Sequence, residues 1–415
     1  MKKILFINIF YSPSSYGGAT IVVEQVSRNL CKIPGYVPFI ISCQSRADLE
    51  HYTVQRVESQ GITNFVINLP PGLSFTDRYD NPKFAEVVSR IVEFTKPDCV
   101  NVHCVQELGA SFFDHIVERN IPLILSIHDF WWVCERQFMI TTADQFCGQT
   151  RIEESACSAC AAIPKQSQLR RQYLKKQADK AAVITYPSKY AKFIHDSSGF
   201  DKAKGIVWNN GIVMPDESFF KLQSKRRSKD DTITFGFLGG PSHMKGWPLI
   251  KDAFKKVNPK HKFNVKVVDG AIWGNWWSGN MFAELPGQWS IYPRFEQTQI
   301  DEYYSNIDVL LFMSQWKETF GLTIREALAR GISVIQTRSG GTEEHPAFNE
   351  DLAIEIGASS NELANILNET LENGIANTEA IEFPTFFDQA VELVRIIDKV
   401  CTANADVPIV SKELS

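Results

Sequence analysis

One stretch of the chain carries most of the information about the fold: Glu318-Thr-Phe-Gly-Leu-Thr-Ile-Arg-Glu-Ala-Leu-Ala-Arg-Gly331. It follows the apolar run Val309–Met313, which predicts a strand, and its own pattern predicts a helix that ends at a glycine cap. Glu318 precedes the helix start, and Glu326 lies about one turn inside the helix. The free N–H groups of a first helical turn suit an anion, most often a phosphate. The stretch therefore predicts a site for a phosphate-bearing ligand with two carboxylates at different depths.

Length and composition restrict the class of protein. The chain has 415 residues, enough for two domains, and its 44% apolar and 22% charged residues are typical of a globular protein. A net charge of -5 argues against a nucleic-acid partner, because no global positive field attracts a phosphate backbone. We expect Met1–Tyr11 to form a buried strand rather than a signal peptide, because it lacks a small-residue cleavage site. A cytoplasmic location follows, in which the nine cysteines are thiols or metal ligands rather than disulfides.

The two halves of the chain begin in the same way. Ile4–Ile9 leads into the glycine pair Gly17-Gly18, and Thr232–Leu238 leads into Gly239-Gly240. A helical pattern follows each pair. Further apolar runs without strict alternation lie at 38–42, 98–103, 122–127, 182–186, 263–268, 308–313 and 332–336. Such runs, separated by helical segments, predict strands buried on both faces of a parallel sheet.

The pattern predicts an α/β protein with two doubly wound, Rossmann-like parallel-sheet domains facing a cleft, where such sheets bind ligands. We expect a first domain at residues 1–213 and a second at 214–385. The tract at 214–231 is expected to be the linker, because its charged residues do not suit a core. Residues 386–415 are expected to form a helix and tail, whose packing the sequence does not specify.

Two glycine loops are candidates for phosphate contact. Gly17 and Gly18 either form a plain strand–helix turn or let the backbone approach a phosphate or sugar. The pair Gly239-Gly240 is followed by Lys245 at a helix start, a combination that suits a diphosphate because amides give direction and an ammonium gives charge. The alternative for Lys245 is an ordinary surface lysine.

His128 and Asp129 follow a predicted strand, at the edge where open α/β sheets carry their active-site residues. A histidine there can bind a substrate hydroxyl or serve a structural role. Farther along, Gly340–Glu344 predicts a second glycine turn near the edge that carries Glu318, with a plain turn as the alternative. The tryptophan-containing loop at 272–279 is either a stacking surface for a sugar or base, or a packed corner.

The segment 131–164 is a long irregular insertion. It contains Cys134, Cys147, Cys157 and Cys160, and the C-x-x-C spacing of the last two suits a structural zinc site. Buried free thiols are the alternative. A basic cluster follows, made up of Arg170, Arg171, Lys175, Lys176 and Lys180. It is either a solvated helix face or a contact for anionic lipid headgroups, which would bring the protein to the inner face of the membrane.

These pieces together resemble the family-four group of retaining glycosyltransferases with the GT-B fold. The resemblance covers nearly the whole chain in the right order. Its motifs are the Gly17-Gly18 loop, His128-Asp-Phe-Trp, Asn210-Gly211, the Lys245-Gly246 loop, the Glu318-x₇-Glu326 pair and Gly340-Gly341-Thr-Glu-Glu. The cysteine insertion also looks like a variant of some members. The resemblance implies an acceptor-side first domain and a second domain that binds a nucleoside diphosphate sugar, with no cofactor for catalysis.

The resemblance also implies roles for single residues. Glu326 is expected to bind the ribose hydroxyls, Glu318 the donor sugar near the reacting carbon, and His128 the sugar and acceptor side. Lys245 and the amides of Phe320, Gly321 and Leu322 are expected to hold the diphosphate. The chain departs from the family at Gly240, where most members carry an arginine. The candidates for a side chain that takes over the role of this arginine are His243, Arg294 and Arg325.

The expected activity is transfer of a sugar from a nucleoside diphosphate to a hydroxyl, with a lipid-linked bacterial surface glycan as the acceptor. A sugar phosphorylase or a nucleotide-sugar epimerase is a competing activity, because the fold alone does not distinguish them. The alternative from another class is a weakly active or non-catalytic sugar-nucleotide-binding subunit of a polysaccharide assembly complex. The missing arginine at Gly240 favours that alternative.

Overall fold

The protein is known from a computed structural model that describes residues 1–12, 17–271, 273–375 and 379–405. Ile272 of the tryptophan loop and residues 406–415 of the expected tail lie outside the described residues. The chain divides into two compact units. The first contains 1–137, 149–211 and the chain from Phe386 on, and the second contains Phe138–Gly148 and Ile212–Thr385. Each unit is built around one sheet.

The first unit has an eight-stranded sheet in the order β3-β4-β2-β1-β5-β6-β7-β8. Its strands are β1 (Lys2–Ile7), β2 (Tyr36–Gln44), β3 (Val54–Ser59), β4 (Ile62–Asn68), β5 (Cys99–Val102), β6 (Leu123–Ser126), β7 (Val183–Tyr186) and β8 (Gly205–Val207). Its helices are α1 (Gly18–Leu30), α2 (Pro82–Thr95), α3 (Phe112–Val117), α4 (Glu154–Cys157), α5 (Pro164–Ala178), α6 (Lys189–Ser197) and α12 (Phe386–Ala405). All neighbouring strands are parallel except β3, which pairs antiparallel with β4.

The second unit has a parallel six-stranded sheet in the order β11-β10-β9-β12-β13-β14. Its strands are β9 (Thr234–Phe237), β10 (Asn264–Val268), β11 (Gln288–Tyr292), β12 (Val309–Phe312), β13 (Ser333–Thr337) and β14 (Ala353–Ile354). Its helices are α7 (Glu217–Arg227), α8 (Trp247–Phe254), α9 (Ile300–Tyr304), α10 (Leu322–Leu328) and α11 (Ser360–Asn373), with short 3-10 turns at Gly279–Phe282, Gln297–Gln299, Gly341–Glu343 and Glu350–Leu352.

Burial in the second sheet explains why its central strand β12 lacks polar alternation. Val309 and Leu311 of β12 belong to one apolar cluster, while Leu310 between them belongs to another. Successive side chains of a strand point to opposite faces, so both faces of this sheet are covered. The expectation of two doubly wound parallel-sheet domains is confirmed.

The expectation that residues 214–231 form a linker was wrong about their local structure. Residues Glu217–Arg227 form the helix α7, whose N-terminus is capped by the side chain of Asp216. Phe219 is fully buried, and Arg226 donates to Asp308 from 2.9 Å. A helix can carry many charges if an apolar side chain on one face reaches a core. Here that side chain is Phe219, and the charged residues around it gave no amphipathic pattern in the sequence.

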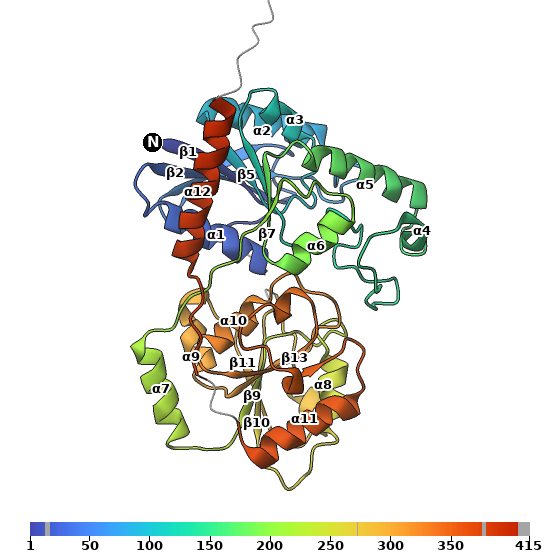
Figure 1. Ribbon diagram of the computed structural model, residues 1–415, viewed down its shortest axis with the longest axis vertical. Coiled ribbons are helices and arrows are strands. Elements are labelled where there is room, and N and C mark those ends of the chain that lie inside the picture. Colours follow the sequence, from blue (N-terminus) through green and yellow to red (C-terminus); the bar gives the residue numbers. More distant parts are fainter. Residues whose placement is uncertain (13–16, 272, 376–378, 406–415) are drawn as a thin grey trace, which may run out of the picture. The chain divides into compact units, whose positions relative to one another are not determined.

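The structure places α12, which the sequence could not. In Figure 1 this helix lies alongside α1 in the first unit. Asp398 of α12 accepts hydrogen bonds from Lys2 and Tyr36, each at 2.7 Å. Gln389 of the same helix bonds Trp208 and Gly211 near the end of the first unit. The C-terminal helix is therefore a part of the first unit. Among the described residues, no helix is long and apolar enough to cross a membrane.

Candidate functional site

The loop between β9 and α8 places Lys245 at the carboxyl end of the second sheet. Gly246 precedes α8 with a φ of 79°, a conformation that favours glycine. A Cβ atom at this position would lie only 2.2 Å from the carbonyl oxygen of Met313, just past β12. The lysine loop is therefore packed directly against the end of the neighbouring strand. Lys245 and Ser314 line a small cavity there of about 90 Å³.

Lys245 and Glu318 form the centre of this site. The Nζ atom of Lys245 lies 3.0 Å from Oε1 of Glu318 and 4.3 Å from the ring centroid of Trp316. The hydroxyl of Ser314 donates to the same carboxylate oxygen from 2.7 Å. Both partners are partly accessible, with 37% of the Lys245 side chain and 19% of the Glu318 side chain exposed. A cation and a carboxylate thus share a solvent-accessible position at the sheet edge.

The glycine turn after β13 holds the backbone of Glu318. The amide of Glu318 donates to the carbonyl of Ser339 from 2.7 Å, and the amide of Gly341 donates back to the carbonyl of Glu318 from 3.0 Å. The side chain of Glu343 caps the turn by accepting from the amide of Gly340. The Gly340–Glu344 segment and Glu318 were expected to lie at one edge, and the structure brings them together there.

Glu326 lies on α10 and is buried. Tyr304 donates to its Oε2 atom from 3.4 Å, and Arg330 donates to its backbone carbonyl from 2.9 Å. Burial raises the pKa of Glu326 from 4.5 to about 7, and the positive charge of Arg330 offsets part of that rise. The two glutamates of the motif therefore differ sharply in environment, since one is ion-paired at the surface and the other is enclosed.

Arg325, one of the candidate replacements for the missing arginine, is engaged in contacts within its own unit. Its guanidinium stacks 3.7 Å from the ring centroid of Phe320 and donates to the carbonyls of Phe320, Gly341 and Glu344. It is buried, and that burial lowers its pKa to about 10. Arg325 thus ties the start of α10 to the glycine turn, and it also helps to fix Gly321, whose φ is 80°. His243 and Arg294 are exposed, and His243 lines a separate groove with Gly246.

Trp276 occupies the space beside Gly240. A Cβ atom on Gly240 would lie 3.2 Å from the Trp276 ring, and one on Gly270 would lie 2.7 Å from it. The other two tryptophans of this loop differ, because Trp277 is buried and donates to the carbonyl of Val268, while Trp273 is 91% exposed. The loop is thus partly a packed corner and partly an exposed surface. A side chain at position 240 would therefore make a tight contact with the indole of Trp276.

The second predicted site residue, His128, follows β6 in the first unit. Its Nε2 atom lies 2.7 Å from Nδ1 of His103, and Nε2 of His103 lies 2.8 Å from Oδ1 of Asn101. Asn101 in turn donates to the hydroxyl of Ser126 from 2.8 Å. Burial lowers the pKa of His128 to about 4. Burial also lowers the pKa of His103 well below its usual value, and the neighbouring imidazole of His128 contributes to that shift. Both rings are therefore neutral at physiological pH.

Asp129 is structural in this arrangement. Its carboxylate accepts from the side chains of Gln106 and Gln137, at 2.5 and 2.6 Å, and from the amide of Trp131 at 2.8 Å. Burial raises its pKa to about 6, and these hydrogen bonds oppose the rise. Asp129 thereby holds the turn that begins the insertion.

The glycine loop of the first unit is described only in part. Gly17 has a φ of 83° and precedes α1, and no atom of the described residues lies within 4 Å of the position that its Cβ would occupy. Gly18 is the first residue of α1. Residues 13–16 lie outside the described part of the chain. The contact of Gly17 and Gly18 with a phosphate therefore stays a prediction.

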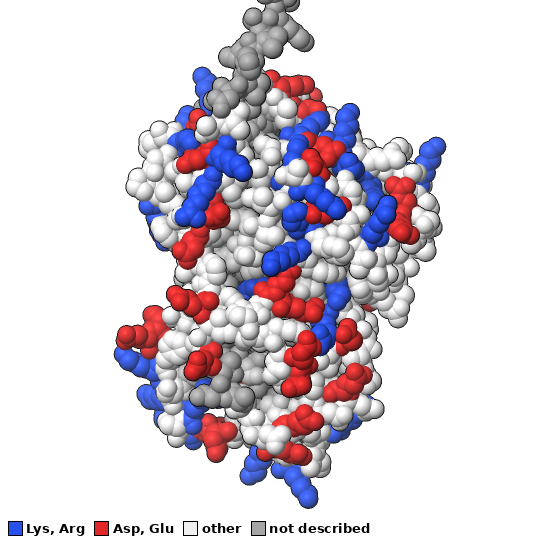
Figure 2. All heavy atoms as spheres, viewed as in Figure 1, with Lys and Arg blue, Asp and Glu red and all other residues white. Residues whose placement is uncertain are grey.

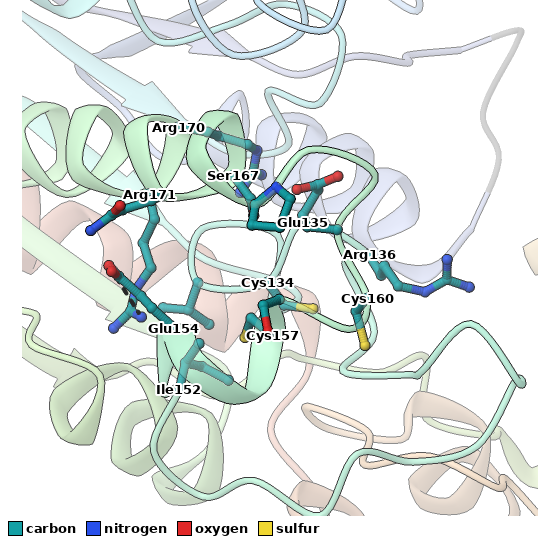
Figure 3. A pocket seen from close by; sticks show the side chains of 15 residues that line it. Cys134, Glu135, Arg136, Ile152, Glu154, Cys157, Cys160, Ser167, Arg170 and Arg171 are labelled. Atoms are coloured by element: carbon teal, nitrogen blue, oxygen red, sulfur yellow. Dashed lines mark ion pairs between the residues drawn. The ribbon is translucent and has the colours of Figure 1, made fainter.

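The structure does not support the zinc hypothesis. Figure 3 shows Cys134, Cys157 and Cys160 lining one pocket beside α5. Cys147, however, belongs to the Phe138–Gly148 segment, which is grouped with the second unit. Across the described part of the chain, no group of three or more His, Cys, Asp or Glu side chains is arranged to hold a metal ion. The four cysteines are therefore divided between the two units.

The basic cluster on α5 is largely committed to internal contacts. Arg170 is buried against the Trp131 ring, 4.5 Å from its centroid, and donates to that residue's carbonyl. Lys175 pairs with Asp179 at 3.2 Å, and Lys180 pairs with Asp114. The ion pair of Arg171 with Glu154 is drawn in Figure 3. In Figure 2, Lys and Arg side chains near α5 and α6 alternate with Asp and Glu side chains. The cluster is therefore not a continuous basic patch on that face.

Comparison with known protein families decides what kind of protein this is. The family described as Glycosyltransferase Family 4 matches residues 16–214, and the family described as Glycosyl transferases group 1 matches residues 218–383. The two matches lie end to end and together cover most of the chain. This chain is a GT-B glycosyltransferase of the family-four type.

Solved structures support the fold of this glycosyltransferase. Anabaena Alr3699/HepE, determined with UDP and glucose, is 16% identical with a TM-score of 0.60, and the match covers 98% of this chain and 99% of that one. Sucrose-phosphate synthase from Thermosynechococcus elongatus is 14% identical with a TM-score of 0.62, over 98% of each chain. Starch synthase IV from Arabidopsis thaliana, bound to ADP and acarbose, is 12% identical with a TM-score of 0.61, over 97% and 99% of the chains.

One relative is similar to this chain in sequence. A Klebsiella pneumoniae protein described as an uncharacterized 42.6 kDa protein in the cps region is 22% identical over 364 residues. The match covers 82% of the glycosyltransferase and 87% of that protein.

Sequence reasoning missed three residues of the site. His103 gave no signal, because a histidine inside an apolar run is usually a core residue. Trp316 lies only two residues before Glu318, and its aromatic type next to a carboxylate motif was a signal that could have been used. Trp276 was included only as one tryptophan among three, and its contact with Gly240 depends on how the loop folds back.

Proposed function

We propose that this glycosyltransferase moves a sugar from a nucleoside diphosphate sugar to a hydroxyl group of a growing glycan, with retention of the anomeric configuration. The observation that carries the proposal is the Lys245–Glu318 pair, 3.0 Å apart, at the carboxyl end of the second sheet. Ligands of open α/β sheets bind at that edge. The solved structures that were determined with UDP or ADP support a nucleotide-sugar donor.

In the proposed reaction, the bond between the anomeric carbon and the diphosphate oxygen breaks while a bond to the acceptor oxygen forms on the same face. The acceptor proton passes to the departing phosphate oxygen. Negative charge grows on the diphosphate, and Lys245 stabilises it without a metal cofactor. The predicted contacts of Gly239, Gly240, Phe320, Gly321 and Leu322 with the diphosphate belong to the same proposal. A preorganised donor of this kind typically contributes a factor on the order of 10²–10³ in rate.

The carboxylates have separate proposed roles. Glu318 accepts a hydrogen bond from a donor-sugar hydroxyl, and it exchanges its Lys245 partner for the ligand when the diphosphate arrives. Glu326 binds the ribose hydroxyls from its enclosed position, where its elevated pKa leaves it partly protonated near neutral pH. His128 contributes a neutral imidazole on the acceptor side. These roles follow from the family resemblance together with the environment of each side chain.

We further propose that the acceptor is a lipid-linked glycan and that the protein works at the inner face of the membrane. The relative in the cps region supports a role in surface-polysaccharide assembly. Exposed Leu169 and Lys176 on α5 supply an apolar and a cationic group for a lipid surface. Sedimentation with vesicles that contain anionic lipid, compared with neutral vesicles, tests the membrane part independently of catalysis.

The decisive experiment is a panel of UDP, GDP and ADP sugars, in which thermal shifts and hydrolysis or transfer are measured together. A ligand at about 100 times its dissociation constant adds roughly 2.7 kcal/mol to the free energy of unfolding, which is easily detected. We expect one base to stabilise the wild type and to support turnover, and Glu318→Gln to lose turnover. No shift with any nucleotide would contradict the donor site. The anomeric configuration of the product, measured by NMR, tests retention.

One observation favours a second function, a binding subunit without significant catalysis. Trp276 packs against Gly240, so the usual arginine clamp has no counterpart at that position. A protein of this kind would bind the nucleotide with ordinary affinity but show no turnover with any acceptor, and Glu318→Gln would leave binding unchanged. Turnover that depends on Glu318 excludes it.

A further inference from the structure

Part of the cysteine insertion belongs to the second unit. Residues Phe138–Gly148 are grouped there, although the chain on either side belongs to the first unit. They form a small hairpin, which is closed by an antiparallel bridge between Ile140 and Phe146 and by a hydrogen bond from the Cys147 amide to the Met139 carbonyl at 2.9 Å. Met139 is fully buried. The hairpin is therefore an ordered, packed element.

The hairpin contacts an aromatic ring at the centre of the candidate site. Phe138 stacks on Trp316, with ring centroids 5.4 Å apart and an interplanar angle of 29°. Trp316 in turn lies 4.3 Å from the Nζ atom of Lys245, which pairs with Glu318. A continuous series of contacts thus runs from the insertion to Lys245, the residue proposed to bind the diphosphate.

A second contact of the hairpin lies beside the same loop. Phe146 lines a groove together with Gly246 and His243, on the loop that carries Lys245. The backbone of this loop is already held by the close approach of Gly246 to Met313. The hairpin therefore reaches the Lys245 side chain by way of Trp316. Its Phe146 also lies beside the loop that carries Lys245.

We propose that Phe138 is a positioning residue for Lys245, and that the insertion contributes to the donor site through this hairpin. A lysine side chain has many rotamers, and a fixed indole face beside its ammonium favours the few that place the charge near Glu318. Stacking by Phe138 fixes the indole. The inference rests on the proposed donor-binding role of Lys245. The hairpin would then act on the donor site, whereas a structural zinc site would have given the insertion only a stabilising role.

A double-mutant cycle on UDP binding tests the proposal, with affinities measured by isothermal titration calorimetry on the full chain. We expect Phe138→Ala to weaken binding roughly three- to tenfold, the range of a lost cation–π arrangement. Phe138→Tyr, which keeps the ring, should retain wild-type affinity. Thr142→Ala, on the exposed part of the same hairpin, is the matched control and should have no effect.

The decisive comparison is made in a Lys245→Ala background. If Phe138 acts through Lys245, then Phe138→Ala should cause no further loss once the lysine is gone, because coupled residues are not additive. A full additional loss in that background, or unchanged affinity of the single Phe138→Ala variant, would overturn the inference. If Lys245→Ala itself leaves UDP affinity unchanged, the proposed donor site is wrong instead. Melting temperatures of all variants separate loss of folding from loss of positioning.

Discussion

The Nδ1 atom of His103 lies 2.7 Å from the Nε2 atom of His128, and this contact fixes where the proton of His128 resides. Asn101 donates through its amide nitrogen to Ser126, so its Oδ1 is the atom that faces His103. A carbonyl oxygen only accepts, so Nε2 of His103 must carry a proton. In a neutral ring Nδ1 of His103 is then an acceptor, and Nε2 of His128 must donate to it.

This arrangement predicts that His128 stays neutral, as the Nε2–H tautomer, from about pH 5 to about pH 8. Its folded-state pKa is about 4, below the ordinary 6.5, so the unfolded chain binds protons first as the pH falls. Stability should therefore decline from about pH 6.5 towards about pH 4. Imidazole ¹⁵N chemical shifts report both the tautomer and the titration. In Asn101→Leu, which keeps His128, we expect a mixture of tautomers; an unchanged spectrum would contradict the assignment.

A second prediction concerns Glu326, whose pKa is raised by burial from 4.5 to about 7. The folded protein keeps a proton on this group that the unfolded chain has lost, so its contribution to stability decreases as the pH rises through that window. Relative to Glu326→Gln, the wild type should lose on the order of 3 kcal/mol between about pH 4.5 and about pH 7.5. Urea unfolding at several pH values measures this difference. A difference that does not change with pH would mean that folding does not raise the pKa of Glu326.

Restoring the family arginine at position 240 should fail. The ring of Trp276 lies 3.2 Å from the Cβ position, so Gly240→Arg must displace an indole that also packs on Gly270. We expect a loss of about 1–3 kcal/mol in stability and no gain in UDP affinity. The double variant Gly240→Arg with Trp276→Ala should recover part of that stability. Tighter UDP binding by the single variant would show that the ring moves aside freely.

The conformation of Gly246 gives a prediction with an internal control. Gly246→Ala places a methyl group 2.2 Å from the Met313 carbonyl at a positive φ, so both strain and a backbone clash result. Gly274 has a similar φ of 70°, but no atom of the described part of the chain lies within 4 Å of its Cβ position, so Gly274→Ala should carry the conformational cost alone, about 1 kcal/mol. We expect the Gly246 variant to lose at least about 1 kcal/mol more and to bind UDP more weakly. Equal stabilities would show that the Met313 contact is unimportant.

Sequence patterns were sufficient for the parallel sheets but not for their edges. The run that became β12 is apolar throughout, which is the mark of a strand covered on both faces. The strand β3 was not expected, because Val54–Ser59 is an exposed antiparallel edge with no apolar run to find. The tract at 214–231 looked like a linker, because Phe219, the buried apolar residue of α7, lies among many charged residues.

The same contrast holds at the site. The sequence by itself determined the two repeated strand–glycine–helix openings, the lysine loop and the paired glutamates, because each depends on local spacing along one strand and helix. It also exposed the missing arginine at Gly240. Local spacing says nothing about partners that come from distant parts of the chain.

Only the tertiary structure decided those partners. It placed the Phe138 ring on Trp316, the indole of Trp276 beside Gly240, and His103 against His128. It also grouped Cys147 with the second unit, whereas spacing alone had taken all four cysteines of the insertion together as zinc ligands. Such contacts depend on which surfaces the fold brings together, and one sequence read along its length does not contain that information in any local pattern.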